Sequence, residues 1–119
     1  MATREDGFTL VELLVVAVLI GLLTAVALGF HASARDRAAD AAAKTNIRVA
    51  IPALEAFKGD NGSYAGVTVT DLQTSYSPGV QGIVILDADE SSYCVSSSVD
   101  GHAWYKRGPE GPITTSSCA

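Results

Sequence analysis

A single acidic residue, Glu12, lies inside the longest apolar run of the sequence, which extends from Phe8 to Phe30. A helix of roughly 20 apolar residues spans the hydrocarbon core of a bilayer, and this run is long enough to do so. A carboxylate inside a membrane span costs about 3 kcal/mol or more, so we expect Glu12 to have a partner of opposite charge. The chemistry that these residues offer is therefore charge pairing in lipid.

Elsewhere the sequence contains no catalytic constellation. His31 and His102 are far apart in the chain, and no pair of metal ligands lies at helical spacing. The serines between Ser91 and Ser98 fit the solvent-facing alternation of a strand, and no base is placed beside them. The sequence therefore predicts a protein that is not an enzyme, with no catalytic residues and no cofactor.

Three acidic residues close together, Asp87, Asp89 and Glu90, form a candidate calcium site, because calcium prefers hard oxygen ligands in loops. A solvated acidic turn between two strands explains the same cluster. We favour the turn, and predict no bound metal.

Charge is distributed unevenly along the chain. The net charge is −5 over 119 residues, which argues against a nucleic-acid partner, because such a surface needs a clustered basic face. Residues 31–58 contain five Lys or Arg and three Asp or Glu, whereas the chain from Gly59 onward contains two against seven. The basic portion thus follows the apolar run directly, and the acidic portion lies further along.

Cys94 and Cys118 both lie in the distal half of the chain. The apolar N-terminal run places that half outside the cytoplasm, where disulfides persist, and an even pair in a small exported domain is more often bridged than free. We predict a Cys94–Cys118 disulfide, which stabilises the domain by about 3 kcal/mol in the chain-entropy description. Two free buried thiols are the alternative.

The segment Gly-Phe-Thr-Leu-Val-Glu, from Gly7 to Glu12, followed by the long apolar run, resembles the N-terminal motif of type IV pilins and type II secretion pseudopilins. The resemblance implies that prepilin peptidase, a membrane aspartic peptidase, cuts between Gly7 and Phe8 and methylates the new amine of Phe8. It also implies that Glu12 pairs with the Phe8 amine of a neighbouring subunit during assembly. The leader differs from the usual basic one, because Arg4 is followed by two acids, so insertion relies more on hydrophobicity.

The resemblance further implies a structural function, as a major or minor pilin of a type IV pilus-like filament. Its partners are then copies of itself and other pilins, prepilin peptidase, the inner-membrane assembly machinery and, before assembly, membrane lipid. The precursor spans the inner membrane once with its C-terminal domain outside, and later joins an extracellular filament. In the family, helix breakers near Gly21 and Gly29 bracket a segment that loosens in the filament, although the family has proline at the second position.

Two other interpretations stay open. The chain could be a major pseudopilin of a type II secretion system, which the motif alone does not separate from a pilin. In a different class, it could be an exported or membrane-anchored binding domain that does not polymerise. Ala32-Ser33-Ala34 offers a signal-peptidase site after the apolar run, although that run is longer than an ordinary signal sequence and contains Glu12.

Helical character continues beyond the apolar run to Lys58. One face is defined by apolar residues spaced three or four apart: Ala39, Ala43, Ile47, Ala50, Leu54 and Phe57. Pro52 removes one backbone hydrogen bond and should bend this helix, and Gly59 should stop it. We therefore expect four segments: a leader (1–7), a membrane or filament-core helix (8–30), its amphipathic continuation (31–58) and a small β-meander domain with a C-terminal loop (59–119).

The meander is predicted to have strands at 82–86, 92–99 and 102–107, after a loop with a short strand near residues 67–69. Asp100-Gly101 predicts a two-residue hairpin, which pairs Val99 with His102 and Ser97 with Trp104. One face of this hairpin, with Tyr93, Val95, Val99 and Trp104, is expected to pack on the apolar helix face. Cys94 then lies on the opposite face, where an otherwise structureless tail brings Cys118 beside it. The predicted fold class is α+β, a long N-terminal helix on a small antiparallel sheet.

Overall fold

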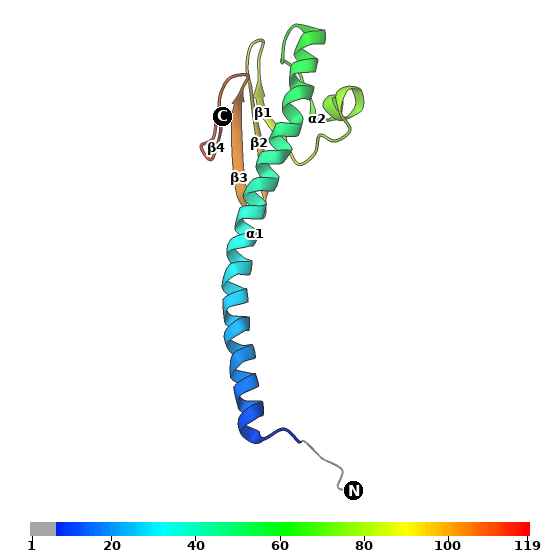
Figure 1. The fold of residues 1–119 in the computed structure, drawn as a ribbon. Helices are drawn as coiled ribbons and strands as arrows, with labels where there is room; N and C mark the ends of the chain where they lie inside the picture. Colours follow the sequence, from blue (N-terminus) through cyan, green and yellow to red (C-terminus); the bar gives the residue numbers. More distant parts are fainter. Residues whose placement is uncertain (1–6) are drawn as a thin grey trace. The chain divides into compact units, whose positions relative to one another are not determined.

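One long helix, α1 (Leu10–Asn61), precedes every other regular element in the computed structural model, which describes residues 7–119 (Figure 1). A short helix, a single π-helical turn and four strands follow it: α2 (Val69–Asp71), η1 (Leu72–Tyr76), β1 (Val84–Ala88), β2 (Tyr93–Val99), β3 (His102–Gly108) and β4 (Ile113–Thr114). The predicted α+β class, a long helix with an antiparallel sheet, is confirmed. The leader residues 1–6 lie outside the described residues.

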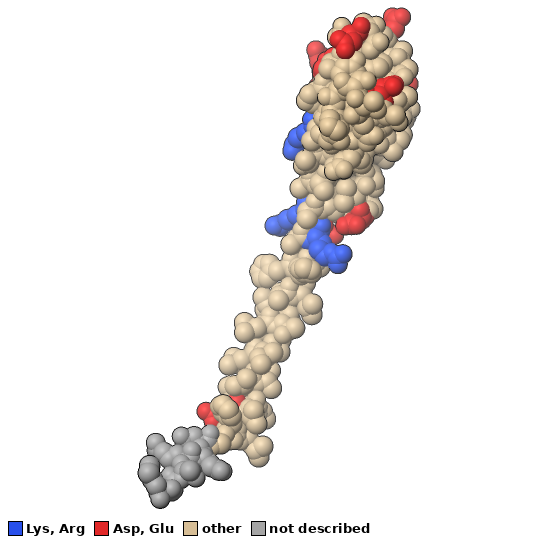
Figure 2. Space-filling model, turned by 90° about the vertical axis from the view of Figure 1, so that its right-hand side faces the viewer, with Lys and Arg blue, Asp and Glu red and all other residues tan. Residues whose placement is uncertain are grey.

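The chain divides into two compact units, an N-terminal one that ends at Arg35 and a C-terminal one, Asp36–Ala119. In the described part of the N-terminal unit, α1 is long and apolar enough to cross a membrane. The large apolar side chains of this described part are all exposed, among them Phe8 at 78 % and Phe30 at 72 %. On the face that Figure 2 shows, this stretch is tan apart from acidic atoms near its lower end, and it is free of Lys and Arg atoms.

Helix α1 ends three residues later than predicted. Gly59 was expected to stop the helix after Lys58, but it lies within the helix, which runs to Asn61. Gly62 is the residue that takes a positive φ, +73°, and its N–H donates to the Lys58 carbonyl at 2.6 Å. Glycine adopts this left-handed conformation without the steric cost that a Cβ imposes, so it is the second glycine that terminates the helix. Pro52 lies inside α1, and the bend expected there stays a prediction.

The segment after α1 is helical, and the short strand predicted near residues 67–69 is wrong. Thr68 is the N-cap of α2: its hydroxyl accepts from the Asp71 N–H at 3.1 Å, and its own N–H donates to the Asp71 carboxylate at 3.3 Å. This reciprocal capping box satisfies two helix-start donors, which favours a helical turn over an extended strand.

The sheet is antiparallel with the order β1-β2-β3-β4. The hairpin prediction is confirmed, because Asp100 and Gly101 both have positive φ and Val99 pairs with His102, as Ser97 does with Trp104. Strand β1 begins two residues later than predicted and contains an irregularity between Ile85 and Asp87. The tail, predicted to be structureless, contributes the edge strand β4, which pairs with β3.

The core of the C-terminal unit lies between α1 and one face of the sheet. The predicted helix face is confirmed: Ala39, Ala43, Ile47, Ala50 and Leu54 are buried, and Phe57 packs at the margin. On the sheet side, Tyr93 and Val95 belong to this cluster and Trp104 packs against it. Val99 does not belong to it; the residue lies beside the hairpin turn and is half-buried.

Candidate functional site

The start of α1 forms a capping box that involves Glu12. The Glu12 N–H donates to the Thr9 hydroxyl at 3.2 Å, and the Thr9 N–H donates to the Glu12 carboxylate at 3.3 Å. Thr9 is the residue before the first helical position, Leu10, so two donors that the helix leaves free at its start are satisfied. The carboxylate is thus oriented at the helix start, beside the N-terminal segment Gly7–Thr9, which lies outside the helix.

The interactions of Glu12 within the described chain are with neutral groups. A backbone N–H lowers the cost of an exposed carboxylate, but does not neutralise its charge. The positive end of the helix dipole adds a further partial charge of the right sign. In lipid, an opposite full charge is still required, and the structure leaves the Glu12 side chain exposed to receive one.

Gly21 and Gly29 lie inside the apolar part of α1. Outside the neighbouring residues and the backbone of the helix itself, a Cβ built on either residue would meet no atom of residues 7–119 within 4 Å. Packing within the chain therefore does not explain these glycines, and the flexibility expected of them stays a prediction.

In the C-terminal unit, polar side chains join α1 to the start of β3. His102 Nδ1 lies 3.0 Å from Asp40 Oδ1, and His102 Nε2 lies 3.5 Å from Asp36 Oδ1. The Trp104 indole N–H donates to Asp40 Oδ1 at 2.9 Å. Donation from Trp104, helped by His102 and opposed by partial desolvation, lowers the pKa of Asp40 below its usual 3.8. Lys44 Nζ lies 4.0 Å from the centroid of the Trp104 ring, a cation–π contact.

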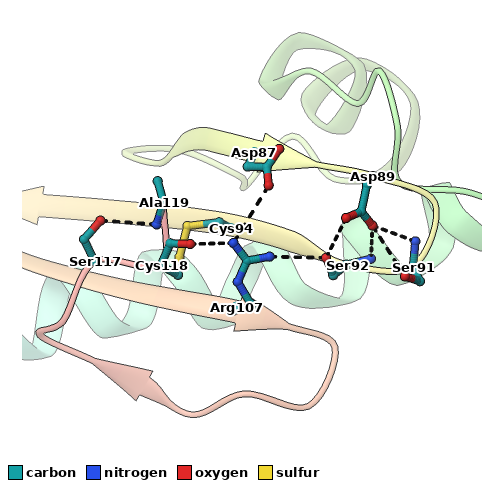
Figure 3. Close-up of polar contacts among 9 residues, drawn as sticks. All are labelled: Asp87, Asp89, Ser91, Ser92, Cys94, Arg107, Ser117, Cys118 and Ala119. Atoms are coloured by element: carbon teal, nitrogen blue, oxygen red, sulfur yellow. Dashed lines mark hydrogen bonds and ion pairs between the residues drawn. A yellow bond between two sulfur atoms is a disulfide. The ribbon is translucent and has the colours of Figure 1, made fainter.

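The opposite face of the sheet holds the predicted disulfide, which is confirmed (Figure 3). The Cα atoms of Cys94 and Cys118 are 5.8 Å apart, and Cys94 is fully buried. Arg107 lies beside the bridge: it donates to the Cys118 carbonyl and to the Ser92 hydroxyl, and pairs with Asp87 at 3.8 Å. The tail is therefore attached to the sheet by a covalent bond and by one arginine.

Two of the three candidate calcium ligands, Asp87 and Asp89, contact different partners within the chain. Asp87 faces Arg107, while Asp89 accepts the N–H groups of Ser91 at 2.9 Å and Ser92 at 2.7 Å (Figure 3). These backbone bonds lower the pKa of Asp89, and they give its carboxylate a structural task in the β1–β2 turn. Within residues 7–119, no group of three or more His, Cys, Asp or Glu side chains is placed to hold a metal ion.

Two tyrosines close the core where α1 ends. Tyr64 and Tyr93 meet edge to face with ring centroids 4.9 Å apart, and the Tyr64 hydroxyl donates to the Glu55 carboxylate at 2.7 Å. Burial raises the pKa of Tyr93 to about 12, and the nearby Glu55 charge adds to this effect. Burial and the bond to Glu55 raise the pKa of Tyr64 as well. Both hydroxyls therefore stay protonated and serve packing rather than acid–base chemistry.

Sequence reasoning missed two of these features. The role of Thr9 was not predicted, although Thr-x-x-Glu before an apolar run is the sequence signature of a capping box. The contacts of His102 with Asp36 and Asp40 join residues more than 60 positions apart, and no local pattern announces such a contact.

Comparisons with known proteins find similarity to a methylation-motif family, to a pilus component and to a secretion-system protein. Residues 3–28 match the family described as "Prokaryotic N-terminal methylation motif". The chain is 30% identical over 110 residues to the "Type IV wide pilus major component PilA4" of Thermus thermophilus, which covers 90% of this chain and 84% of that protein. It is also 38% identical over 61 residues to the "Type II secretion system core protein G" of Pseudomonas aeruginosa, which covers 51% of this chain and 43% of that protein.

Proposed function

Because the chain belongs to the type IV pilin and pseudopilin family, we propose that it is a structural pilin subunit of a type IV pilus-like filament. One observation above all supports this. The N-terminal part of helix α1 presents an apolar surface that none of residues 7–119 covers, interrupted by a single carboxylate beside the N-terminal segment. Such a surface is stable only in lipid or against other apolar helices, which are the two environments of a subunit before and after polymerisation.

We propose that the precursor is cut between Gly7 and Phe8 by prepilin peptidase, and that the new amine of Phe8 is methylated. Gly7 and Phe8 lie outside α1 and are exposed, as the substrate of a peptidase must be. The matched methylation motif includes both residues. The inner-membrane location of the precursor, with its C-terminal unit outside, follows from the same proposal and agrees with the disulfide.

In the filament, Glu12 would accept the charged Phe8 amine of a neighbouring copy. The capping box aims the carboxylate at the start of the helix, where the amine of another chain could approach it. Each of these two opposite charges is costly alone in an apolar environment, and pairing would neutralise both. This pairing selects the axial register between neighbouring helices.

A type II secretion pseudopilin is the second candidate, supported by the similarity to core protein G. The pilin is favoured because similarity to the pilus component extends over 90% of the chain, and so includes the sheet, whereas the other match covers about half.

The first test is the intact mass and N-terminal sequence of the protein isolated from its native cells. A chain that starts at methylated Phe8 is the expected result. A start at Arg35, after Ala34, would instead identify an exported soluble domain, and an uncut Met1 in cells that contain the peptidase would identify a plain membrane anchor. Either of the last two outcomes overturns the proposal.

A second measurement separates pilus from secretion. Cells that lack the gene should lose surface filaments in electron micrographs while secreting the same set of proteins as the parent. The reverse pattern would assign the chain to a secretion system.

A further inference from the structure

Three basic side chains, Arg37, Lys44 and Arg48, follow one another along a single side of α1 in the C-terminal unit. Their spacings of seven and four residues correspond to two turns and one turn of helix, so they form one basic stripe. Arg37 and Arg48 are exposed, and Lys44 is half-buried over Trp104. Among residues 7–119, the ion pairs involve His102 and Arg107 and none of the three side chains of the stripe.

The two arginines of the basic stripe lie away from the side of α1 that packs on the sheet, whereas Lys44 borders Trp104 of β3. The buried positions nearest to it in sequence, Ala39, Ala43 and Ile47, occupy another face of the helix. Exposed residues between the arginines along the stripe, Ala41 and Thr45, are small and uncharged. A partner can therefore approach both guanidinium groups without meeting a bulky side chain.

Carboxylates gather at the opposite end of the same unit, where α1 ends. Four of them form what we call the acidic end: Asp60, Asp71, Asp89 and Glu90. The Tyr64 N–H donates to the Asp89 carbonyl at 3.1 Å, which joins the β1–β2 turn to the end of α1. The Tyr76 hydroxyl donates to Asp60 at 2.8 Å, and its pKa is raised by this bond and, to a smaller extent, by the charge of Asp71. Figure 2 shows acidic atoms gathered at this end of the unit.

The basic stripe and the acidic end cannot neutralise one another within one copy. Along α1, Asp60 lies 12 residues beyond Arg48 and 23 beyond Arg37, or about 18 to 35 Å at 1.5 Å per residue. Exposed charges are screened over about 8 Å at physiological ionic strength. The two surfaces are therefore separate charged patches within one copy, although Asp40 offsets part of the charge of Lys44 in the stripe.

We propose that the basic stripe of one copy docks on the acidic end of a second copy of this chain. This inference rests on the proposed function, since it places the contact between subunits of the filament. The two surfaces are different patches, so the contact is heterologous, and a heterologous contact that does not close repeats into an open filament. It shifts one copy against the next by about 18 to 35 Å along the helix axis, the distance between the two surfaces.

A second copy is favoured over an anionic lipid surface because it satisfies both patches. Lipid headgroups would neutralise the basic stripe but leave the acidic end unpartnered. Complementary charges between subunits also fix register and disfavour wrong pairings, because like charges brought together repel one another. Burial of the apolar helices stabilises the filament without selecting a particular arrangement of subunits. The charged surfaces select which neighbour a subunit binds and in which register.

The test is charge reversal and exchange in the full chain, expressed in native cells from which the wild-type gene is removed. Arg37→Glu with Arg48→Glu should lower the yield of sheared surface filaments about tenfold or more, because the reversed stripe repels the acidic end. Asp60→Lys with Glu90→Lys should do the same. The four changes combined in one chain should restore filaments to about half of the wild-type yield or better, since the pair is attractive again.

Arg35→Glu is the matched control for a single Arg48→Glu change. Both arginines are exposed on α1, but Arg35 lies on another side of the helix from the stripe, so its reversal should leave the yield unchanged. The docking contact is wrong if Arg35→Glu and Arg48→Glu lower the filament yield equally, or if the variant with all four changes does not recover filaments. Either result would mean that the net charge of the chain, or its binding to lipid, controls the yield. The membrane pool of each precursor, measured by immunoblot, verifies that the variants are made and inserted.

The proposed function is tested separately by Glu12→Ala in the same cells. If Glu12→Ala abolishes filaments while the stripe variants assemble normally, the filament assignment stands and the docking contact is wrong. If the wild-type chain produces no filaments either, the assignment itself is wrong.

Discussion

The two units of this chain solve the problem of apolar surface in opposite ways. In the C-terminal unit, helix α1 buries Ile47, Ala50 and Leu54 completely against the sheet. In the N-terminal unit, the same helix leaves leucine, valine and phenylalanine side chains at half to more than three-quarters of full exposure. The C-terminal unit has its own core, whereas the apolar side chains of the N-terminal unit can be covered only by lipid or by other chains. A protein built this way can leave the membrane only if other copies replace the lipid.

The largest effect that separates the two units is expected from Glu12→Ala. The change removes the proposed partner of the Phe8 amine, and an unpaired charge in an apolar environment costs about 3 kcal/mol, equivalent to a loss of assembly of about hundredfold. Surface filaments, counted in electron micrographs, report assembly.

The same variant should not affect the C-terminal unit. Trp104 is the only tryptophan and lies in that unit, so its fluorescence during denaturation of the detergent-solubilised chain reports that unit alone. A lowered midpoint in Glu12→Ala would contradict the independence of the two units.

Leu54→Ala and Leu22→Ala compare one residue type on both sides of the boundary. Leu54 is 0 % exposed and Leu22 is 60 % exposed on the same helix. Removing a buried leucine side chain costs about 2 to 5 kcal/mol through lost burial and the cavity left behind, so Leu54→Ala should strongly lower the denaturation midpoint read by Trp104. Leu22→Ala should leave that midpoint unchanged. Equal shifts would mean that the two units share a core.

Cys118→Ser tests how the tail is held within the C-terminal unit. Loss of the disulfide should cost about 3 kcal/mol in the chain-entropy description, and should release residues after Gly108 to proteases. Limited proteolysis and the Trp104 midpoint measure the two effects. Ser117→Ala, one residue away and exposed, is the control and should change neither. A tail that stays protected in Cys118→Ser would show that Arg107 and the β3–β4 pairing hold it without the bridge.

The smallest expected effect is on the stability of the C-terminal unit at acidic pH, through Asp40. The folded state lowers the pKa of Asp40 below 3.8, so the unfolded chain binds more protons in this range and the contribution of Asp40 to stability is lost as pH falls below about 3.8. In Asp40→Asn, this part of the acid dependence of the Trp104 midpoint should disappear. Asp100→Asn serves as the control, because asparagine tolerates the positive φ of that exposed turn position and should keep the wild-type pH profile. A wild-type profile in Asp40→Asn would contradict the role of this carboxylate.

Patterns of short range predicted much of the fold correctly. Asp100-Gly101 sets the β2–β3 register because two adjacent residues that tolerate positive φ define the turn and, through it, every pair along the hairpin. The face of α1 that packs on the sheet follows from the helical period alone. The helix end was misplaced because Gly59 and Gly62 both fit a stop, and which of them leaves helical geometry depends on the loop that follows.

The regions predicted poorly depend on contacts between distant segments. Strand β4 consists of two residues, Ile113 and Thr114, and its pairing with β3 is a contact that no local pattern in the tail predicts. For the candidate site, Gly7, Phe8 and Glu12 were recognised from their local order, and their roles in processing and assembly remain proposals. The contacts of His102 with α1 had no sequence signal.

The sequence by itself determined three consecutive regions: an apolar helix with one carboxylate, a basic continuation of that helix, and an acidic domain with one pair of cysteines. These features depend on residue type and spacing, which act locally. Only the tertiary structure decided which polar side chains meet across the domain, such as Asp40 with Trp104 and with His102. It also decided which charges remain on its surface, because pairing and burial depend on packing between segments that are far apart in the chain.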